Sequence, residues 1–233
     1  MQSMLDLYKQ QTKCLVALDS IIFGFDGADL KILLVKRGIE NHTDTWSLMG
    51  GWLASNESIE QAAQRILFDL TGLNNVFLEQ LHAFGDINRD PVERTVAVTY
   101  YALINVPDYD AEVSETHKAQ WFHANQLPEM LFDHAAMVQL AKERLRYKAA
   151  FHPIGFELLP EKFTIPQLQN LYEAIYETQM DKRNFSRKIL STKLLVKLSE
   201  KQKGFSKKGA YLYCLDLEEY QKQITSIGIF EKF

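Results

Sequence analysis

Short runs of hydrophobic residues in the first half of the chain, rich in valine, isoleucine and leucine, predict β-strands. An Asp26-Gly27 pair between the first two runs is typical of a turn, so we expect these strands to form a hairpin. The predicted strands are Leu15–Phe25, Leu30–Lys36, Val76–Phe84, Arg94–Val106 and Ala119–Phe122.

Between the second and third strands the hydrophobic positions change to helical spacing. The residues with this spacing are Ile59, Ala63, Ile66 and Leu70. Ser58 and Gln61 have the spacing of a capping box at the start of this helix, and Gly72 is a typical residue to end it. A second helical region is expected to begin near Asn125–Pro128 and to continue over 133–148. Strands that alternate with a few helices indicate an α/β sandwich.

The hydrophobic pattern breaks over residues 152–163, where two prolines and a glycine interrupt it. We therefore predict a first domain over 1–152 and a second domain over 153–233. The second begins with a helix whose capping box is formed by Thr164 and Gln167.

The rest of the second domain follows the order of a winged helix-turn-helix. Asp181 is a plausible N-cap for a helix over 182–192. Two strands, Leu194–Leu198 and Tyr211–Leu215, follow it and flank a polar, glycine-containing hairpin. The pattern after Leu217 predicts no particular structure.

Composition excludes several classes of protein. The 233 residues are 46% hydrophobic and 24% charged, which is ordinary for a globular protein. Cys14 and Cys214 lie far apart with no ligand spacing near either, so neither a disulfide framework nor a zinc site is expected. The longest hydrophobic run, Cys14–Phe25, contains Asp19 and is too short to cross a bilayer. We expect a cytoplasmic protein without a signal peptide or membrane partner.

Positive charge is concentrated in the second domain, although the whole chain has a net charge of −4. Between Lys182 and Lys208 there are ten basic residues and one acidic residue. A helical projection of 182–192 places Phe185, Ile189 and Leu190 on an inner face, and Arg183, Asn184, Arg187 and Lys188 on the opposite face. Such a face suits the major groove of DNA, and a basic hairpin suits its backbone. The predicted DNA-binding residues are Lys182, Arg183, Asn184, Ser186, Arg187, Lys188, Lys201, Lys203, Lys207 and Lys208.

One stretch of the first domain resembles the Nudix box. The matching positions are Gly51, Glu57, Arg65, Leu67, Gly72 and Leu73. In that motif three glutamates on one helical face bind divalent metal, which polarises a pyrophosphate and activates water. This chain has Ile66, Asp69 and Leu70 in their places. The resemblance therefore implies a Nudix-like fold whose hydrolase chemistry is lost, with no catalytic residues, bound metal or cofactor.

The two domains together resemble Nudix-related transcriptional regulators. The supporting stretches beyond the box are Asp90-Pro91 with Arg94, the run 132–134, and residues 168–188. The resemblance implies an α/β Nudix-like α/β/α sandwich followed by a small α+β winged helix-turn-helix domain. It also implies a homodimeric repressor that binds a double-stranded DNA operator and a small-molecule effector.

The family has two branches that differ in their effector. This chain looks closest to the L-arabinose-responsive regulators of pentose use in Bacteroidetes, which implies a sugar as effector. The alternatives are an ADP-ribose-responsive regulator of NAD metabolism, a working Nudix hydrolase of a nucleoside diphosphate derivative, and a winged helix that binds protein.

A sugar pocket needs groups that pair with hydroxyls and an aromatic or apolar wall. The predicted effector-binding residues are Asp19, Lys36, Arg37, Trp46, Glu93 and Arg94. His82 and His134 are isolated histidines, and we expect both to have structural roles.

Overall fold

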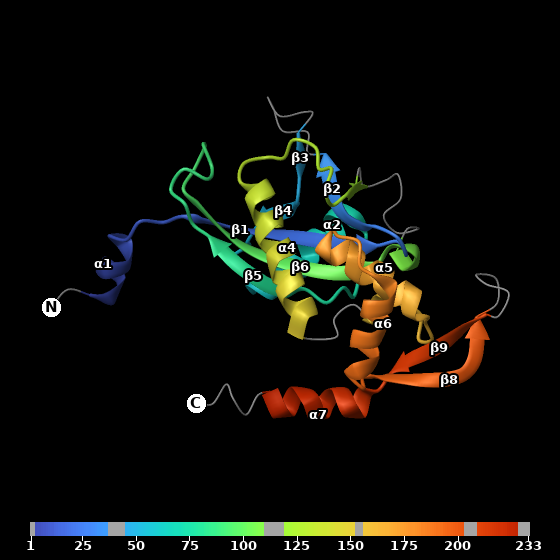
Figure 1. The fold of residues 1–233 in the computed structure, drawn as a ribbon. Coiled ribbons are helices and arrows are strands. Elements are labelled where there is room, and N and C mark those ends of the chain that lie inside the picture. Colours follow the sequence, from blue (N-terminus) through green and yellow to red (C-terminus); the bar gives the residue numbers. More distant parts are fainter. Residues whose placement is uncertain (1–2, 37–44, 110–118, 152–155, 203–208, 228–233) are drawn as a thin grey trace. The chain divides into compact units, whose positions relative to one another are not determined.

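The computed structural model of the protein describes residues 3–36, 45–109, 119–151, 156–202 and 209–227 (Figure 1). Contacts divide the chain into two compact units. The first unit contains Met1–Phe23, Ile32–Ala102 and Tyr109–Ala141, and the second contains Gly24–Lys31, Leu103–Asp108 and Lys142–Phe233. The boundary expected between residues 152 and 153 stays a prediction. No helix in the described ranges is long and apolar enough to span a membrane.

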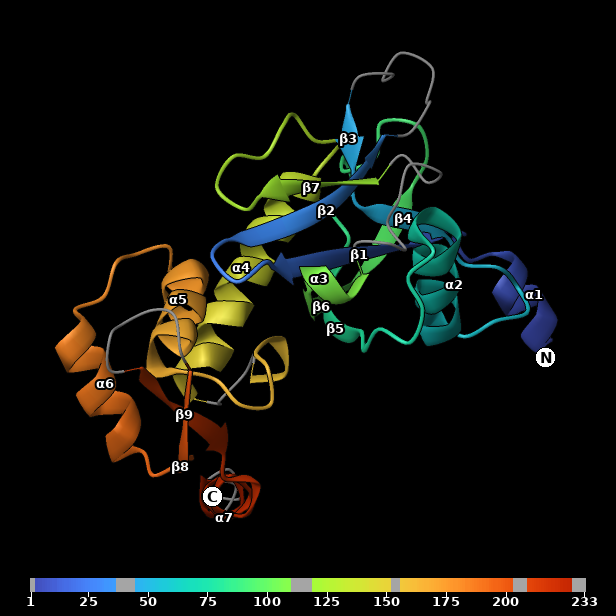
Figure 2. The ribbon, with the colours of Figure 1, turned by 90° about the vertical axis from the view of Figure 1, so that its right-hand side faces the viewer.

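A seven-stranded sheet forms the centre of the N-terminal part. Its strands are β1 (Leu15–Phe25), β2 (Leu30–Lys36), β3 (Trp46–Ser47), β4 (Met49–Trp52), β5 (Glu79–Phe84), β6 (Thr95–Asn105) and β7 (Ala119–His123). The main path runs β3-β2-β1-β6-β5, while β4 pairs with β1 and β7 pairs with β2 (Figure 2). The five predicted strands are present with ends close to those expected. The two short strands β3 and β4 were not predicted.

Helix α2 (Ile59–Thr71) covers one face of this sheet. Ser58 caps its first turn in a capping box with Gln61, and Gly72 ends it in the left-handed conformation with φ of 76°, as predicted. Its inner face packs against Leu18 of β1. Because neighbouring strand residues point to opposite faces, the next side chain, Asp19, points to the other face of the sheet.

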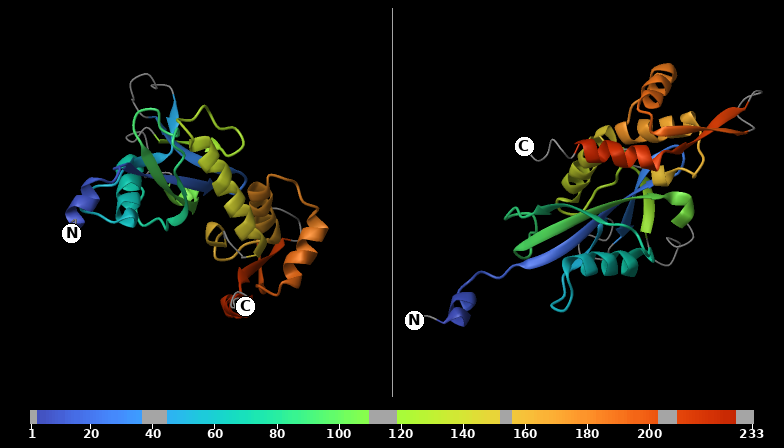
Figure 3. Two further views of the ribbon diagram at one scale, coloured as in Figure 1. Left: turned by 90° about the vertical axis from the view of Figure 1, so that its left-hand side faces the viewer. Right: turned by 90° about the horizontal axis from the view of Figure 1, so that it is seen from below.

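Helix α4 (His134–Phe151) begins on that second face, where His134 approaches Asp19. The two helices therefore lie on opposite faces of the sheet in an α/β/α arrangement (Figure 3). The helical region predicted to begin near residues 125–128 is wrong at its start, because a turn occupies residues 124–126. Two short helices, α1 (Met4–Lys9) and α3 (Val106–Tyr109), were not predicted.

The C-terminal part combines helices with a two-stranded sheet. Its elements are the 3-10 turn η1 (Phe156–Leu158), α5 (Ile165–Tyr176), α6 (Lys182–Ser191), β8 (Leu195–Gln202), β9 (Ala210–Leu215) and α7 (Leu217–Ile227). Phe163 pairs with Tyr213 of β9 through two backbone hydrogen bonds of 3.0 and 2.7 Å, which extends this small sheet. Helix, turn, helix and hairpin follow one another as predicted. Helix α7 occupies the stretch for which no structure was expected.

Ion pairs within the second unit join the later turns of α4 to the end of α5. Glu177, the C-cap of α5, accepts from Lys142, and its other oxygen lies 2.7 Å from Arg146 Nη2. Arg146 Nε also donates to the carbonyl of Ile175 at 3.1 Å, and the Tyr176 hydroxyl donates to the carbonyl of Arg146 at 3.1 Å. These groups fix α5 just before the turn that leads into α6.

Candidate nucleic-acid interface and effector pocket

Helix α6 is anchored by its inner side chains. Asp181 caps its N-terminus and accepts a hydrogen bond from the backbone N–H of Asn184 at 2.8 Å. Phe185 packs edge-on against Tyr172 of α5 with ring centroids 5.6 Å apart, and Ile189 is buried. Leu190 is 43% exposed, so its predicted place on the inner face is wrong: at 100° per residue it lies about 140° around the helix from Phe185.

The opposite face of α6 presents the predicted basic residues to solvent. Lys182, Arg183, Asn184, Arg187 and Lys188 are exposed, and Ser186 is partly exposed. Arg187 Nη2 donates to the side-chain oxygen of Asn184 at 2.9 Å, which orients both groups on the same surface. This face can offer hydrogen-bond donors to bases and phosphates because it is not used in packing.

The hairpin of β8 and β9 adds further positive charge. Lys201 is exposed, and its ammonium lies 4.4 Å from the ring centroid of Tyr211. Lys197, which was not predicted, lies 3.6 Å from the same centroid. The sequence signal for Lys197 is the lysine that recurs four residues later, at Lys201. Lys203, Lys207 and Lys208 lie outside the described residues.

Scaffold residues of the Nudix box form an ion pair. Arg65 donates from Nη2 and Nε to the two carboxylate oxygens of Glu57, at 2.6 and 2.8 Å. These hydrogen bonds, together with one from the backbone N–H of Ala54, lower the pKa of Glu57 to about 2. Asp69 is 56% exposed and lies 3.6 Å from Arg65, so it belongs to this surface cluster.

The two aliphatic residues of the box are part of the core. Ile66 is 4% exposed and belongs to a cluster with Leu18, Ala63 and Tyr100, against which Leu70 packs. A Cβ on Gly51 would lie 2.9 Å from Cγ1 of Ile66, so only glycine fits at this strand position. Among the described residues, no group of three or more His, Cys, Asp or Glu side chains could hold a metal ion. The residues present therefore do not fit the three-carboxylate metal site of the motif.

A cavity of about 380 Å³ lies on the other face of the sheet, within the first unit. Its lining residues are Ala17, Asp19, Gly50, Gly51, Trp52, Arg89, Asp90, Val92, Thr95, Leu131, Phe132 and His134. Trp52, Val92 and Phe132 are exposed large side chains that can offer an apolar wall. The volume falls in the range of small-molecule sites, about 300–1,000 Å³.

Asp19 and His134 form one polar side of this cavity, and both are 4% exposed. His134 Nδ1 accepts the backbone N–H of Leu48 at 3.2 Å, so in neutral histidine the proton is on Nε2, which lies 3.7 Å from Asp19 Oδ1. A Cβ on Gly50 would lie 2.0 Å from the Asp19 carboxylate, which explains the glycine there. His134 therefore lines the candidate site, and its expected role as a structural residue stays a prediction.

A buried arginine forms another polar side. Arg89 lies on the loop between β5 and β6, and its guanidinium binds the carboxylate of Asp133 through two hydrogen bonds of 2.8 and 3.0 Å. The neighbouring Phe132 has φ of 48°, a conformation that is rare for bulky residues. Sequence reasoning missed Arg89 as a site residue, although the flanking Asp90-Pro91 and 132–134 stretches were already noted as shared with the regulators.

Of the five predicted effector-binding residues that the structure describes, only Asp19 lines this cavity. Lys36 and Trp46 are paired across β2 and β3, with the ammonium 5.4 Å from the indole centroid. Glu93 and Arg94 line a shallow depression that shares Asp90 and Val92 with the cavity. Arg94 donates to the backbone carbonyls of residues 85 and 86 at 3.0 and 3.2 Å. Arg37 lies outside the described residues.

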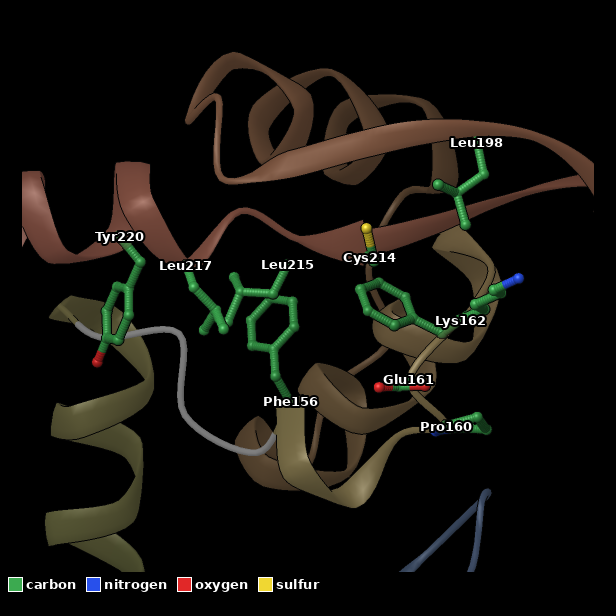
Figure 4. Close-up of a pocket in the computed structure, with 10 residues that line it drawn as sticks. Phe156, Pro160, Glu161, Lys162, Leu198, Cys214, Leu215, Leu217 and Tyr220 are labelled. Carbon is green, nitrogen blue, oxygen red and sulfur yellow. The ribbon is translucent and has the colours of Figure 1, made fainter.

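A second cavity, of about 760 Å³, lies within the C-terminal part between η1, strands β8 and β9 (the wing) and the start of α7 (Figure 4). Its wall is largely apolar and includes Phe156, Leu215, Leu217 and Tyr220. Lys162 at its edge forms an ion pair of 2.6 Å with Glu200 of β8.

Comparison with known proteins identifies both halves of the chain. A model of the NUDIX domain matches residues 15–141, and a model of the NrtR DNA-binding winged helix domain matches residues 155–215. The ADPR responsive transcriptional repressor NtrR of Acinetobacter baylyi is 31% identical over 210 residues, which cover 88% of this chain and 84% of the relative. The chain belongs to the NrtR family of Nudix-domain regulators.

Two solved structures extend this finding. NrtR of Shewanella oneidensis complexed with a 27mer DNA matches with a TM-score of 0.73 and 28% identity, over 88% of this chain and 95% of that chain. The NUDIX domain of that protein complexed with ADP ribose matches with a TM-score of 0.51 and 27% identity, over 62% of this chain and 99% of that chain. The predicted Nudix-like fold followed by a winged helix domain is confirmed. The predicted closeness to the L-arabinose branch has no support in these matches, which favour the ADP-ribose alternative.

Proposed function

We propose that this chain is a transcriptional repressor whose affinity for double-stranded operator DNA is controlled by ADP-ribose bound to its Nudix domain. The observation that carries the proposal is the exposed basic face of α6 within a winged helix of the NrtR family. Its relative in Acinetobacter baylyi is an ADPR responsive repressor and matches most of both chains. As a DNA-binding protein it would act in the cytoplasm.

The roles on the DNA side follow from side-chain chemistry. Arg183 and Arg187 can each fork onto a guanine, and Asn184 can pair with an adenine. The lysines of α6 and of the wing would contact phosphates and fix the position of the helix in the groove. A homodimer would place two such helices on half-sites about 34–36 Å apart, one turn of the duplex.

The cavity on the first unit is the proposed effector site. Trp52 and Phe132 provide aromatic surface for a base, and the carboxylate of Asp19 can accept hydrogen bonds from ribose hydroxyls. ADP-ribose is preferred over L-arabinose because it is the ligand of the related NUDIX domain and the effector of the related repressor.

The proposed sensor binds ADP-ribose without hydrolysing it. Nudix hydrolysis depends on carboxylates that hold divalent metal, and here Ile66 and Leu70 pack into the core instead. Asp69 is the one acidic residue left at the three positions, and it is exposed beside Arg65.

Isothermal titration of the full chain tests these points. ADP-ribose is expected to bind with a measurable dissociation constant, while L-arabinose at millimolar concentration gives no heat of binding. The same samples, incubated with Mg²⁺ and separated by chromatography, should contain intact ADP-ribose. Binding of L-arabinose alone would restore the pentose alternative, and release of AMP would restore the hydrolase. If the winged helix binds a protein instead of DNA, excess heparin, a polyanion that competes with DNA, should not displace that protein.

A further inference from the structure

Arg89 is the single arginine or lysine among the described residues that line the cavity of the first unit. Its side chain is only 3% exposed. A charged guanidinium removed from water is costly unless it is paired, so its position requires a partner. Asp133 supplies that partner, and it is 23% exposed. The cavity therefore has one fixed positive charge in its wall, held by a carboxylate that does not line it.

The geometry of the pair leaves part of the guanidinium available. Nε donates to Asp133 Oδ2 at 3.0 Å, and Nη2 donates to Oδ1 at 2.8 Å. Arginine has five N–H donors in a rigid plane, and this bidentate pair uses two of them. No described residue accepts a hydrogen bond from Nη1. The remaining donors are fixed in direction, so binding an anion there would cost little side-chain entropy of Arg89.

The two carboxylates in the cavity wall do not compete for Arg89. Asp90 accepts from the backbone N–H of Val92 at 2.9 Å and from the Thr95 hydroxyl at 3.3 Å. Asp19 faces His134. Neither carboxylate is therefore paired with Arg89, and that of Asp19 suits the hydroxyl groups of a ligand.

We propose that Arg89 binds the diphosphate of a nucleotide-sugar effector, and that Asp133 is the positioning residue that holds the guanidinium in its binding orientation. This inference rests on the proposed function, because it assumes that the effector occupies this cavity. It fixes the orientation of the ligand, with the phosphates at Arg89 and a ribose toward Asp19. Such an arrangement would distinguish nucleotide sugars from free pentoses, which have no group for Arg89.

The test is the ADP-ribose affinity of the full chain at 50 and 300 mM NaCl. Arg89→Gln is expected to weaken binding about 10–100-fold at low salt, the range for hydrogen bonds to charged groups. The wild-type affinity should fall several-fold between the two salt concentrations, because the contact is between a cation and an anion. In Arg89→Gln this salt dependence should largely disappear, an effect that general damage to the pocket would not produce.

Three further variants separate positioning from direct contact. Arg89→Lys should recover part of the affinity and the salt dependence, since it restores the charge without the fork. Asp133→Asn should weaken binding about 3–10-fold but keep the salt dependence, because Arg89 remains charged. Adding Asp133→Asn to Arg89→Gln should cause no further loss. Arg144→Gln, an exposed arginine of α4 that does not line the cavity, is the matched control and should bind like the wild type.

Two results would overturn the inference: an Arg89→Gln affinity within threefold of the wild type, or a weaker affinity with unchanged salt dependence. Either result leaves ADP-ribose binding by the wild-type chain intact, so the proposed function would stand. A wild-type chain that does not bind ADP-ribose would instead refute the proposed function and this inference with it.

Discussion

Replacing Ile66 by alanine tests whether the Nudix box helix is now a core element. Ile66 is 4% exposed and packs with Leu18, Ala63 and Tyr100 between the sheet and α2. Truncation removes buried methyl groups and leaves a cavity, a change that costs about 2–5 kcal/mol at well-packed sites. We expect the middle of this range, about 3 kcal/mol, because Gly51 has no side chain with which to fill the space.

Tryptophan fluorescence during urea unfolding measures this loss of stability in the first unit of the fold, which contains Ile66. All three tryptophans, Trp46, Trp52 and Trp121, belong to the first unit, so their signal reports its unfolding separately from the winged helix. For a slope of about 2 kcal/mol per molar urea, the midpoint should fall by roughly 1.5 M.

Asp69→Ala is the matched control on the same helix. Its carboxylate is 56% exposed and makes an i,i+4 contact of 3.6 Å with Arg65, which is worth about 0.5 kcal/mol or less. A loss of less than about 1 kcal/mol for Ile66→Ala, or a larger loss for Asp69→Ala than for Ile66→Ala, would show that Ile66 does not hold α2 against the sheet.

Three other predictions follow from described contacts. Lys182→Ala with Lys188→Ala should leave the thermal midpoint unchanged and lower the slope of log DNA affinity against log salt by about 1.8, if each of these exposed lysines neutralises one phosphate. The pKa of Glu57 is lowered in the folded protein, so its stabilising effect is present above a pH of about 4.5 and is lost as the pH falls toward 2. The difference in urea midpoint between the wild type and Glu57→Gln should therefore disappear over that pH interval. Glu177→Gln removes the carboxylate shared by Lys142 and a neighbouring arginine, and should lower stability by about 1–3 kcal/mol in thermal unfolding followed by circular dichroism.

Each of these predictions has its own control. Arg144→Ala removes an exposed arginine from α4 and should leave the salt slope of DNA binding unchanged; an equal fall in slope would mean that the effect of the α6 variants is nonspecific. A Glu57→Gln difference that persists at pH 2 would contradict the assigned ion pair. Lys162→Gln breaks an exposed pair with Glu200 and should cost less than Glu177→Gln; the reverse order would contradict the proposed importance of the α4–α5 contacts.

The longer helices and strands before α7 could be predicted because their signals are local. Ser58, Gln61 and Gly72 define α2 within a single stretch, and Asp181 begins α6 where the helical pattern begins. The exposed basic face of α6 follows from the same 100° projection. Leu190 does not belong to the inner face, because at 100° per residue it lies about 100° from Ile189 and about 140° from Phe185.

The effector pocket could be predicted only in part, because tertiary contacts assemble it. Arg89 and Asp133 are 44 positions apart and meet only when the β5–β6 loop and the start of α4 come together. The sequence points to Asp19 as a candidate because it is a carboxylate within a largely hydrophobic strand. Trp46 was chosen for its aromatic ring, but its side chain packs edge-on against Phe122 with centroids 4.6 Å apart instead of lining the cavity.

In the proposed mechanism, one ligand on the Nudix domain controls DNA binding by the winged helix. Fluorescence anisotropy can measure this control directly. An operator sequence is first selected from random duplexes by its binding to the protein and is then labelled. The labelled DNA is titrated with the full chain, with and without saturating ADP-ribose. ADP-ribose is expected to change the dissociation constant for DNA by at least about fivefold, the lower range of allosteric coupling, while L-arabinose has no effect. Equal DNA affinity with and without bound ADP-ribose would contradict it.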